Sequence, residues 1–271
     1  MAIEAKGRGE SPAIEVLGLE KSYGGPKILR GLDLTVQRGE TLVILGGSGS
    51  GKSTLLRCMV GLEQPDAGTV HIQGTDLFAA DRATLAELRR RMGMAFQGSA
   101  LFGSLTVAGN VDLPLRELTR LPASTRRIVV QIKLALVGLE SALERYPAEL
   151  SGGMQKRAAF ARAMALDPDL MFCDEPSAGL DPVTAAGLDR LLIRLKEVFG
   201  MTLVIVTHEM DSAFAVADRI ALMHRGRFLV TGPPETVRAS QNEIVRRFLD
   251  RVPEEEHDEG ERYEQLMRSW A

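Results

Sequence analysis

The sequence contains few of the features that mark secreted, membrane-spanning or nucleic-acid-binding chains. Its 271 residues include only two cysteines, Cys58 and Cys173, each in an apolar stretch, which favours reduced core thiols over a disulfide or a metal site. No apolar run approaches the roughly 18 residues that a membrane helix needs. The polar first ten residues lack the apolar segment of a signal peptide. The net charge is −3 and no basic run of five occurs, so we expect a cytoplasmic protein with no nucleic-acid partner.

Glycine, in contrast, is concentrated in one segment, which reads GGSGSGKST from Gly46 to Thr54. The apolar run 41–45 before it predicts a buried strand and the run 53–60 after it predicts a helix, and this context predicts a phosphate-binding P-loop. Glycines let the loop close around phosphates at positive φ, and the helix N-terminus favours an anion. We expect Lys52 to reach the β- and γ-phosphates and the Ser53 hydroxyl to ligate Mg²⁺. The nucleotide-binding residues predicted in this loop are Gly46, Gly47, Ser48, Gly49, Ser50, Gly51, Lys52, Ser53 and Thr54.

The remaining pattern predicts an α/β protein. With 45% hydrophobic residues the chain can bury a full core, either as one large domain or as a core with a subdomain. Residues 98–150 are mostly helical in character, with breaks expected at their prolines. The strands predicted at residues 170–174 and 201–207 are short and apolar. They enclose a helix over 185–199, which indicates a βαβ unit. The predicted strands cover residues 14–19, 32–36, 69–72, 93–97, 170–174 and 201–207.

Two acids follow the apolar run that begins at Leu170 and reads LMFCDE. An acid at the end of a buried strand beside a P-loop is where Mg²⁺ needs support, and we assign that role to Asp174. Glu175 is placed to polarise the attacking water. Without the P-loop, a strand that ends in ordinary solvated acids would be the better interpretation.

A second glycine segment, LSGGMQ, begins at Leu150. Ser151 is a good N-cap, and Gly152 and Gly153 leave backbone N–H groups open to an anion. Taken alone, the segment is better described as a capped helix start. The ordered set of P-loop, Gln97, LSGGMQ, LMFCDE, SAGLD from Ser177 and VTH ending at His208 resembles the ATP-binding subunit of ABC transporters, over about residues 13–235.

This resemblance implies a P-loop ABC ATPase core, in which a mixed sheet is covered by helices, with an antiparallel β subdomain and an inserted α-helical subdomain. The ATPase domain would cover residues 13–240, the helical subdomain about 98–168, and a C-terminal extension 241–271. It also implies a head-to-tail homodimer that holds two ATP and drives a membrane permease. In such a dimer Ser151, Gly152 and Gly153 of one subunit close over the ATP bound by the other.

Further residues take their roles from the resemblance alone. Tyr23 matches the aromatic residue that stacks on adenine, and Gln97 matches the glutamine that senses Mg²⁺. His208 matches the histidine that contacts the γ-phosphate, and Asp181 matches an acid at the dimer interface. The family usually has Gln where this chain has Met154, and no loss of activity is expected from that change. The implied catalytic set is therefore Lys52, Glu175 and His208, with ATP as substrate and Mg²⁺ as cofactor held by Ser53, Gln97 and Asp174.

A narrower resemblance lies between Gly93 and Glu117, which is similar to the ATPases of the Mla phospholipid-trafficking and Mce lipid-import systems. Residues 151–157 and 243–249 fit the same group, whereas Gly109 stands where the group usually has Glu. The resemblance implies lipid transport at the cytoplasmic face of the inner membrane, together with a permease and a periplasmic MCE-type lipid-binding subunit. We expect the permease helix to contact the apolar residues near Gln97, namely Phe96, Leu101, Phe102, Leu105 and Val107.

Other functions remain open. The same ATPase could serve another ABC importer, for amino acids or metal chelates. A non-transport ABC ATPase is disfavoured because the chain has one P-loop and no long insertion between Lys52 and Leu150, and a P-loop kinase is disfavoured by the LSGGM segment and His208.

The end of the chain has a distinct composition. An acidic linker begins at Pro253, and beyond it Tyr263, Leu266, Met267 and Trp270 are spaced to share one face of a short helix. Because so short a helix is marginal alone in water, we expect this face to dock on a protein surface, with the second subunit of the dimer preferred. The alternative is a disordered end.

Overall fold

Two β-sheets of different kinds organise the computed structural model, which describes residues 11–252. The larger sheet has the strand order β10-β9-β3-β8-β7-β6, and all of its pairings are parallel except that of β9 with β10. Its central strands are continuous apolar runs because helices and the second sheet cover both faces. These strands are β3 (Thr41–Leu45), β6 (Met92–Ala95), β7 (Leu170–Asp174), β8 (Thr202–Thr207), β9 (Arg219–His224) and β10 (Arg227–Gly232).

The smaller sheet is wholly antiparallel and has the order β2-β1-β4-β5. In β2, Leu32, Leu34 and Val36 are buried, whereas Asp33 and Thr35 between them are exposed and half-buried, because only one face of the sheet packs on the core. The bounds are β1 (Ile14–Lys21), β2 (Leu29–Val36), β4 (Ala67–Ile72) and β5 (Thr75–Asp76).

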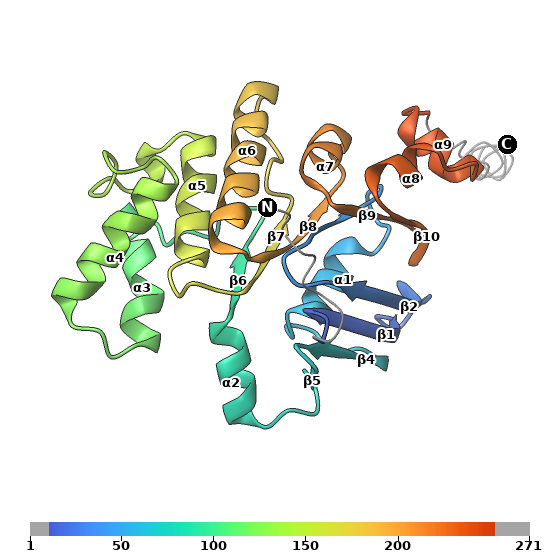
Figure 1. Cartoon of the computed structure of the whole chain (residues 1–271), viewed down its shortest axis with the longest axis horizontal. Helices are drawn as coiled ribbons and strands as arrows, with labels where there is room; N and C mark the ends of the chain where they lie inside the picture. The colour runs from blue at the N-terminus through green and yellow to red at the C-terminus, as the bar shows by residue number, and fades with distance from the viewer. Residues whose placement is uncertain (1–10, 253–271) are drawn as a thin grey trace, which may run out of the picture.

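The helices fall into separate groups around these sheets (Figure 1). In Figure 1, α3, α4 and α5 gather at one end of the molecule, and α8 and α9 lie at the other end. The helices are α1 (Lys52–Met59), α2 (Arg82–Arg90), α3 (Val107–Leu118), α4 (Ala123–Leu136), α5 (Gly152–Ala163), α6 (Pro182–Phe199), α7 (Met210–Val216), α8 (Pro234–Arg238) and α9 (Glu243–Leu249), with a 3₁₀ turn η1 at Pro147–Glu149.

A buried side chain holds the second half of the loop that leads from β6 into α3. Asn110 is fully buried, and its amide nitrogen donates to the carbonyl oxygens of Phe102, Leu105 and Thr106 at 3.0–3.2 Å. The expectation that prolines break the helices was wrong at Pro114, which lies inside α3. Its ring removes one backbone donor but does not end the helix, whose inner face is buried.

Two hydrophobic clusters meet at the larger sheet. Because side chains alternate along a strand, Val43 and Leu45 join one cluster with the helices α3 to α6, whereas Leu42 and Ile44 join the other with the small sheet and α1. The P-loop follows β3 directly, so its position is fixed by both clusters.

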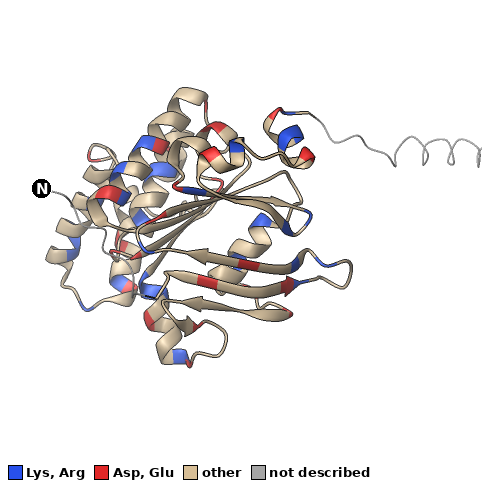
Figure 2. Ribbon diagram, turned by 45° about the vertical axis from the view of Figure 1, so that its right-hand side comes forward, with Lys and Arg blue, Asp and Glu red and all other residues tan. Residues whose placement is uncertain are grey.

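The sequence-based fold class is confirmed, as a mixed sheet with helices and an antiparallel β subdomain. The numerical domain limits remain a prediction, and the expected helix near Trp270 lies outside the described residues. Between residues 11 and 252, no helix combines the length and apolar character that crossing a bilayer requires. Basic and acidic residues are interspersed along the described elements (Figure 2).

Candidate functional site

The loop between β3 and α1 has the backbone of an anion cradle. Gly51 adopts φ 106° and precedes α1, and no side chain caps that helix, so its first N–H groups are available to a phosphate. At Gly46 a Cβ would lie 2.2 Å from the carbonyl oxygen of Met223. Glycine is therefore required at both ends of the loop, by conformation at Gly51 and by space at Gly46.

Lys52 is folded over this loop. Its side chain is buried, and Nζ donates to the carbonyl oxygens of Gly46 at 2.8 Å and Gly47 at 2.9 Å. Burial lowers the pKa of Lys52, while the nearby carboxylates of Glu175 and Asp174 oppose that shift. The ammonium therefore stands beside the cradle, and its loop carbonyls are partners that a phosphate can replace.

Asp174 is the last residue of β7. Like the P-loop, it therefore lies at the carboxyl ends of the parallel strands. Its Oδ1 is buried without a hydrogen-bond partner among the described residues, as is the hydroxyl oxygen of Ser50 in the P-loop. Burial, followed by the charge of Glu175, raises the pKa of Asp174. An orphaned carboxylate oxygen beside a phosphate cradle fits Mg²⁺, which takes one or two protein oxygens together with phosphate oxygens. No group of three or more metal-binding side chains occurs within residues 11–252, and such a magnesium site needs none.

Glu175 is paired with residues that follow the neighbouring strand. Its Oε2 accepts from Thr207 Oγ1 at 3.0 Å, and its Oε1 lies 2.9 Å from His208 Nδ1. Strands β7 and β8 run parallel with Asp174 opposite Val206, so their carboxyl ends bring these groups together. Glu175 has a φ of 47°, a left-handed conformation that is unusual for a residue with a side chain. The His208 side chain is half exposed.

Tyr23 shares a hollow with the P-loop. The hollow has a volume of about 420 Å³, and its lining includes Tyr23, Gly49 and Arg225. The Tyr23 ring is 55% exposed and its hydroxyl donates to the carboxylate of Glu63. Tyr23 therefore keeps exposed surface near the loop, and Lys21 Nζ lies 5.6 Å from its ring centroid.

The other predicted residues lie on separate elements. The Gln97 side chain is exposed just after β6. Ser151 caps α5 by accepting from the Met154 N–H at 3.3 Å. Asp181 caps α6 through Val183 and Thr184, and the hydrogen bonds from Thr184 lower its pKa.

The LSGGM segment and the P-loop belong to different parts of the chain. Helix α5 packs on α3, α4, α6 and β6, whereas α1 packs on β1, β7 and β8. Within one chain the structure therefore brings Lys52, Asp174, Glu175 and His208 to one edge of the sheet and leaves Ser151 to Gly153 on the helical side (Figure 1).

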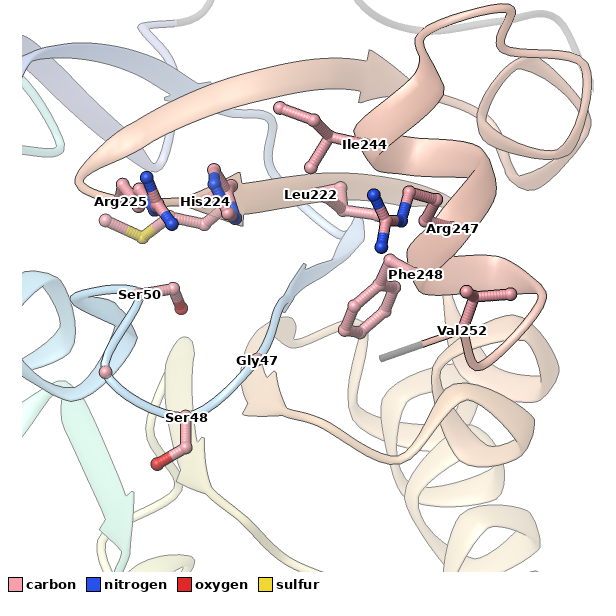
Figure 3. Close-up of a pocket in the computed structure, with 12 residues that line it drawn as sticks. Gly47, Ser48, Ser50, Leu222, His224, Arg225, Ile244, Arg247, Phe248 and Val252 are labelled. Atoms are coloured by element: carbon pink, nitrogen blue, oxygen red, sulfur yellow. The ribbon is translucent and has the colours of Figure 1, made fainter. Parts of the chain in front are cut away.

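A larger cavity of about 690 Å³ adjoins the P-loop between β9 and α9 (Figure 3). Figure 3 shows Ser48 and Ser50 of the loop on one side and Ile244, Arg247 and Phe248 of α9 on another. No local sequence pattern predicts this cavity, because it joins segments almost two hundred residues apart. The remaining lining residues are Gly47, Gly49, Leu222, Met223, His224, Arg225 and Val252.

Two residues near the site were also missed. Thr207 looked like the last residue of an apolar strand, and nothing local indicates that it binds Glu175. Lys156 gives a clearer signal, because Ala159, Phe160 and Ala163 follow it at helical spacing and would place it in an apolar stripe. A cation in such a position needs a partner.

Comparison with known proteins agrees with this geometry. Residues 29–178 match the family described as ABC transporter. The probable ribonucleotide transport ATP-binding protein mkl of Mycobacterium bovis is 42% identical over 88% of this chain. The matched part spans 66% of that relative's length. The methionine import ATP-binding protein MetN of Leifsonia xyli subsp. xyli is also 42% identical, over 88% of the chain and 71% of the relative.

Solved structures show the same fold. The chain resembles cbiO1 from Clostridium perfringens, part of the ABC transporter complex cbiONQ, with a TM-score of 0.79, 30% identity and coverage of 96% of this chain and all of that one. It also resembles the ATP-binding cassette MJ0796, solved as a dimer in a post-hydrolysis state with ADP and Pi, with a TM-score of 0.75, 32% identity and coverage of 82% and 98%. The chain therefore belongs to the ABC transporter ATPase family.

Proposed function

We propose that this chain hydrolyses ATP as the nucleotide-binding subunit of an ABC transporter. The observation that carries the proposal is the cluster of Lys52, Asp174 and Glu175 at one edge of the large sheet, beside an uncapped helix N-terminus. In this proposal the loop N–H groups and Lys52 bind the phosphates, and Glu175 orients the attacking water. His208 contacts the γ-phosphate. Ser53, Asp174 and Gln97 would hold Mg²⁺, and the ion would supply positive charge opposite the charge that develops on the phosphate oxygens.

The working unit in this proposal is a head-to-tail pair of chains. Ser151 to Gly153 start α5 on the helical side of the molecule, away from the P-loop of their own chain. The family pattern requires the two segments to meet across ATP, and a second copy supplies that contact. The dimeric state of the related cassette MJ0796 supports this arrangement.

The partner in the membrane is proposed to be a permease that docks near Gln97. Phe96 and Phe102 expose 38% and 53% of their surfaces there, while Leu101 is half buried and Val107 is fully buried in the core. The docking surface would therefore include the two phenylalanines and exclude Val107. The chain would act at the cytoplasmic face of the inner membrane through this partner.

Two proposals differ in the substrate that the transporter carries. The relatives are named for ribonucleotide transport and methionine import, which favours a small polar solute, the alternative considered above. The lipid proposal, with its periplasmic MCE-type subunit, rests on the resemblance of residues 93–117, 151–157 and 243–249 and is the weaker one. Purification of the native complex, with mass spectrometry of its membrane subunit and bound small molecules, decides between them. A phospholipid retained with an MCE-type subunit would reverse this ranking.

The ATPase proposal is tested with the purified full chain. ATP hydrolysis should require Mg²⁺ and stop with EDTA, and the rate should rise more than linearly with protein concentration because each site needs a second copy. ATP that binds without being hydrolysed at any concentration, with or without the permease, would overturn the proposal. Hydrolysis that is strictly linear in concentration by a confirmed monomer would overturn the paired site.

A further inference from the structure

Lys156 is a buried cation on α5 that joins two parts of the proposed nucleotide site. Its side chain is only 7% exposed. Nζ donates to the carbonyl oxygen of Gln97 at 2.5 Å and to that of Glu175 at 3.3 Å. An ammonium removed from water must keep such partners, because an unpaired buried charge is strongly unfavourable. Burial lowers the pKa of Lys156, and the carboxylates of Glu175 and Asp174 oppose that shift.

The loop after Gln97 is held by a second cation from the same helix. Arg162 donates to the carbonyl oxygens of Ser99 at 3.2 Å and Ala100 at 2.6 Å. Both residues have left-handed backbone, with φ values of 60° and 48°. Such a conformation costs free energy unless its surroundings hold it. Helix α5 thus holds the backbone from Gln97 to Ala100 at three carbonyl groups and leaves the Gln97 side chain exposed.

Lys156 also contacts the backbone carbonyl of Glu175, the residue proposed to orient the attacking water. Glu175 also has left-handed backbone, and its carbonyl oxygen accepts from the Ala178 N–H at 3.3 Å as well as from Lys156. A change at this carbonyl alters the direction of the side chain that meets Thr207 and His208. Lys156 is therefore connected to the carboxylate through one residue's backbone.

We propose that Lys156 is a positioning residue, which ties the Gln97 carbonyl to the Glu175 carbonyl so that a movement of α5 is transmitted to the hydrolysing carboxylate. The role depends on hydrogen-bond donation across two elements and not on filling space. This inference rests on the proposed ATPase function, because the effect on turnover has meaning only if the chain hydrolyses ATP.

The test compares two substitutions of similar length in the full chain. Lys156→Met keeps the volume and removes all donors, whereas Lys156→Gln keeps an NH₂ group with two hydrogens to donate. The Met variant should lower kcat about tenfold with the affinity for a non-hydrolysable ATP analogue changed less than twofold. The Gln variant should recover kcat to within about threefold of the original chain.

Lys133→Met is the matched control, because Lys133 is also a buried lysine (4% exposed) but pairs with Asp167, away from the site. It should lower the unfolding midpoint and leave kcat unchanged. A Met variant with kcat within twofold of the original chain, or a Gln variant as slow as Met, would overturn the proposal.

Hydrogen exchange separates this inference from the proposed function. The amides of Ser99 and Ala100 are hydrogen-bonded within the loop, so their exchange reports whether the backbone is held. In the nucleotide-free chain, Lys156→Met should speed exchange at residues 97–102 about tenfold, and Lys156→Gln should not. If the original chain shows no ATPase activity, the proposed function fails, and this measurement still decides whether Lys156 holds the loop. Equal exchange in all three chains would overturn that role.

Discussion

Glu175 is the residue on which the proposed chemistry depends most directly. Glu175→Gln should keep ATP binding and lower turnover by at least about 100-fold, since an amide cannot act as a general base. The variant should accumulate as a dimer that holds two ATP. Size-exclusion chromatography with bound-nucleotide analysis and a steady-state ATPase assay measure both effects. Glu209→Gln, which changes an acid 3.3 Å from the other ring nitrogen of His208, is the control and should retain turnover.

Substitution of Lys52 is expected to affect nucleotide binding, whereas substitution of Glu175 is expected to affect hydrolysis. Lys52→Ala should lose nucleotide binding itself, because it removes the cation that stands over the loop carbonyls.

Full ATPase activity in Glu175→Gln would show that another group orients the water.

The buried acid Asp189 gives a pH prediction. It is 7% exposed and accepts from Ser212 Oγ at 2.7 Å, and burial raises its pKa above the ordinary 3.8. The folded chain therefore binds this proton more tightly than the unfolded chain, so its contribution to stability falls as pH rises through the window between the two pKa values. The unfolding free energy of Asp189→Asn, relative to the original chain, should be higher at about pH 7 than at about pH 4 in urea titrations. A difference that does not change with pH would contradict the prediction.

At this scale the sequence predicted residues that form a contiguous motif and missed residues joined only by the fold. Lys52 and Asp174 carry their chemistry in their immediate neighbours along the chain. Thr207 and Lys156 acquire theirs from strand β8 lying beside β7 and from α5 packing near β6. No local pattern reports those pairings, because they depend on the order of strands in the sheet.

The loop between β6 and α3 is the element proposed to meet the permease. Phe102→Glu should abolish assembly with the membrane subunit while the chain stays folded, because the side chain is already 53% exposed. Val198→Glu, at a residue of α6 that is 64% exposed, is the control and should assemble normally. Affinity pull-down from membranes and circular dichroism measure the two properties. Normal assembly of Phe102→Glu would place the docking surface elsewhere.

Elements were predicted well where burial was complete. The bounds of β3 and β7 agree with the predicted runs because every residue of β3 and all but the last residue of β7 are buried. The extent of helix α3 was predicted incorrectly, because Pro114 suggested a break in it. That signal was overridden by packing of Val107, Val111 and Leu115 on the core, an interaction that the proline rule does not include.

For the whole molecule, the acidic C-terminal segment remains a prediction, since residues 253–271 lie outside the described part. Deletion of these residues should weaken dimer or complex assembly and leave ATP binding per site unchanged, because every proposed site residue lies between Tyr23 and His208. Analytical ultracentrifugation and nucleotide titration measure the two effects. Fluorescence of Trp270, the only tryptophan, is an independent measurement. Emission of a fully exposed indole, unchanged by assembly, would mean that the segment docks nowhere.

In the proposed function, a chain made in excess of its partners behaves differently from an assembled one. In the single chain both carboxylate oxygens of Glu175 are engaged, one by Thr207 and the other by His208, and Ser151 to Gly153 have no nucleotide to close over. Under the proposed paired site, a surplus copy is therefore restrained twice, by its own side chains and by the lack of a second copy. Overproduction of this subunit should burden a cell with the synthesis of protein and not with futile consumption of ATP.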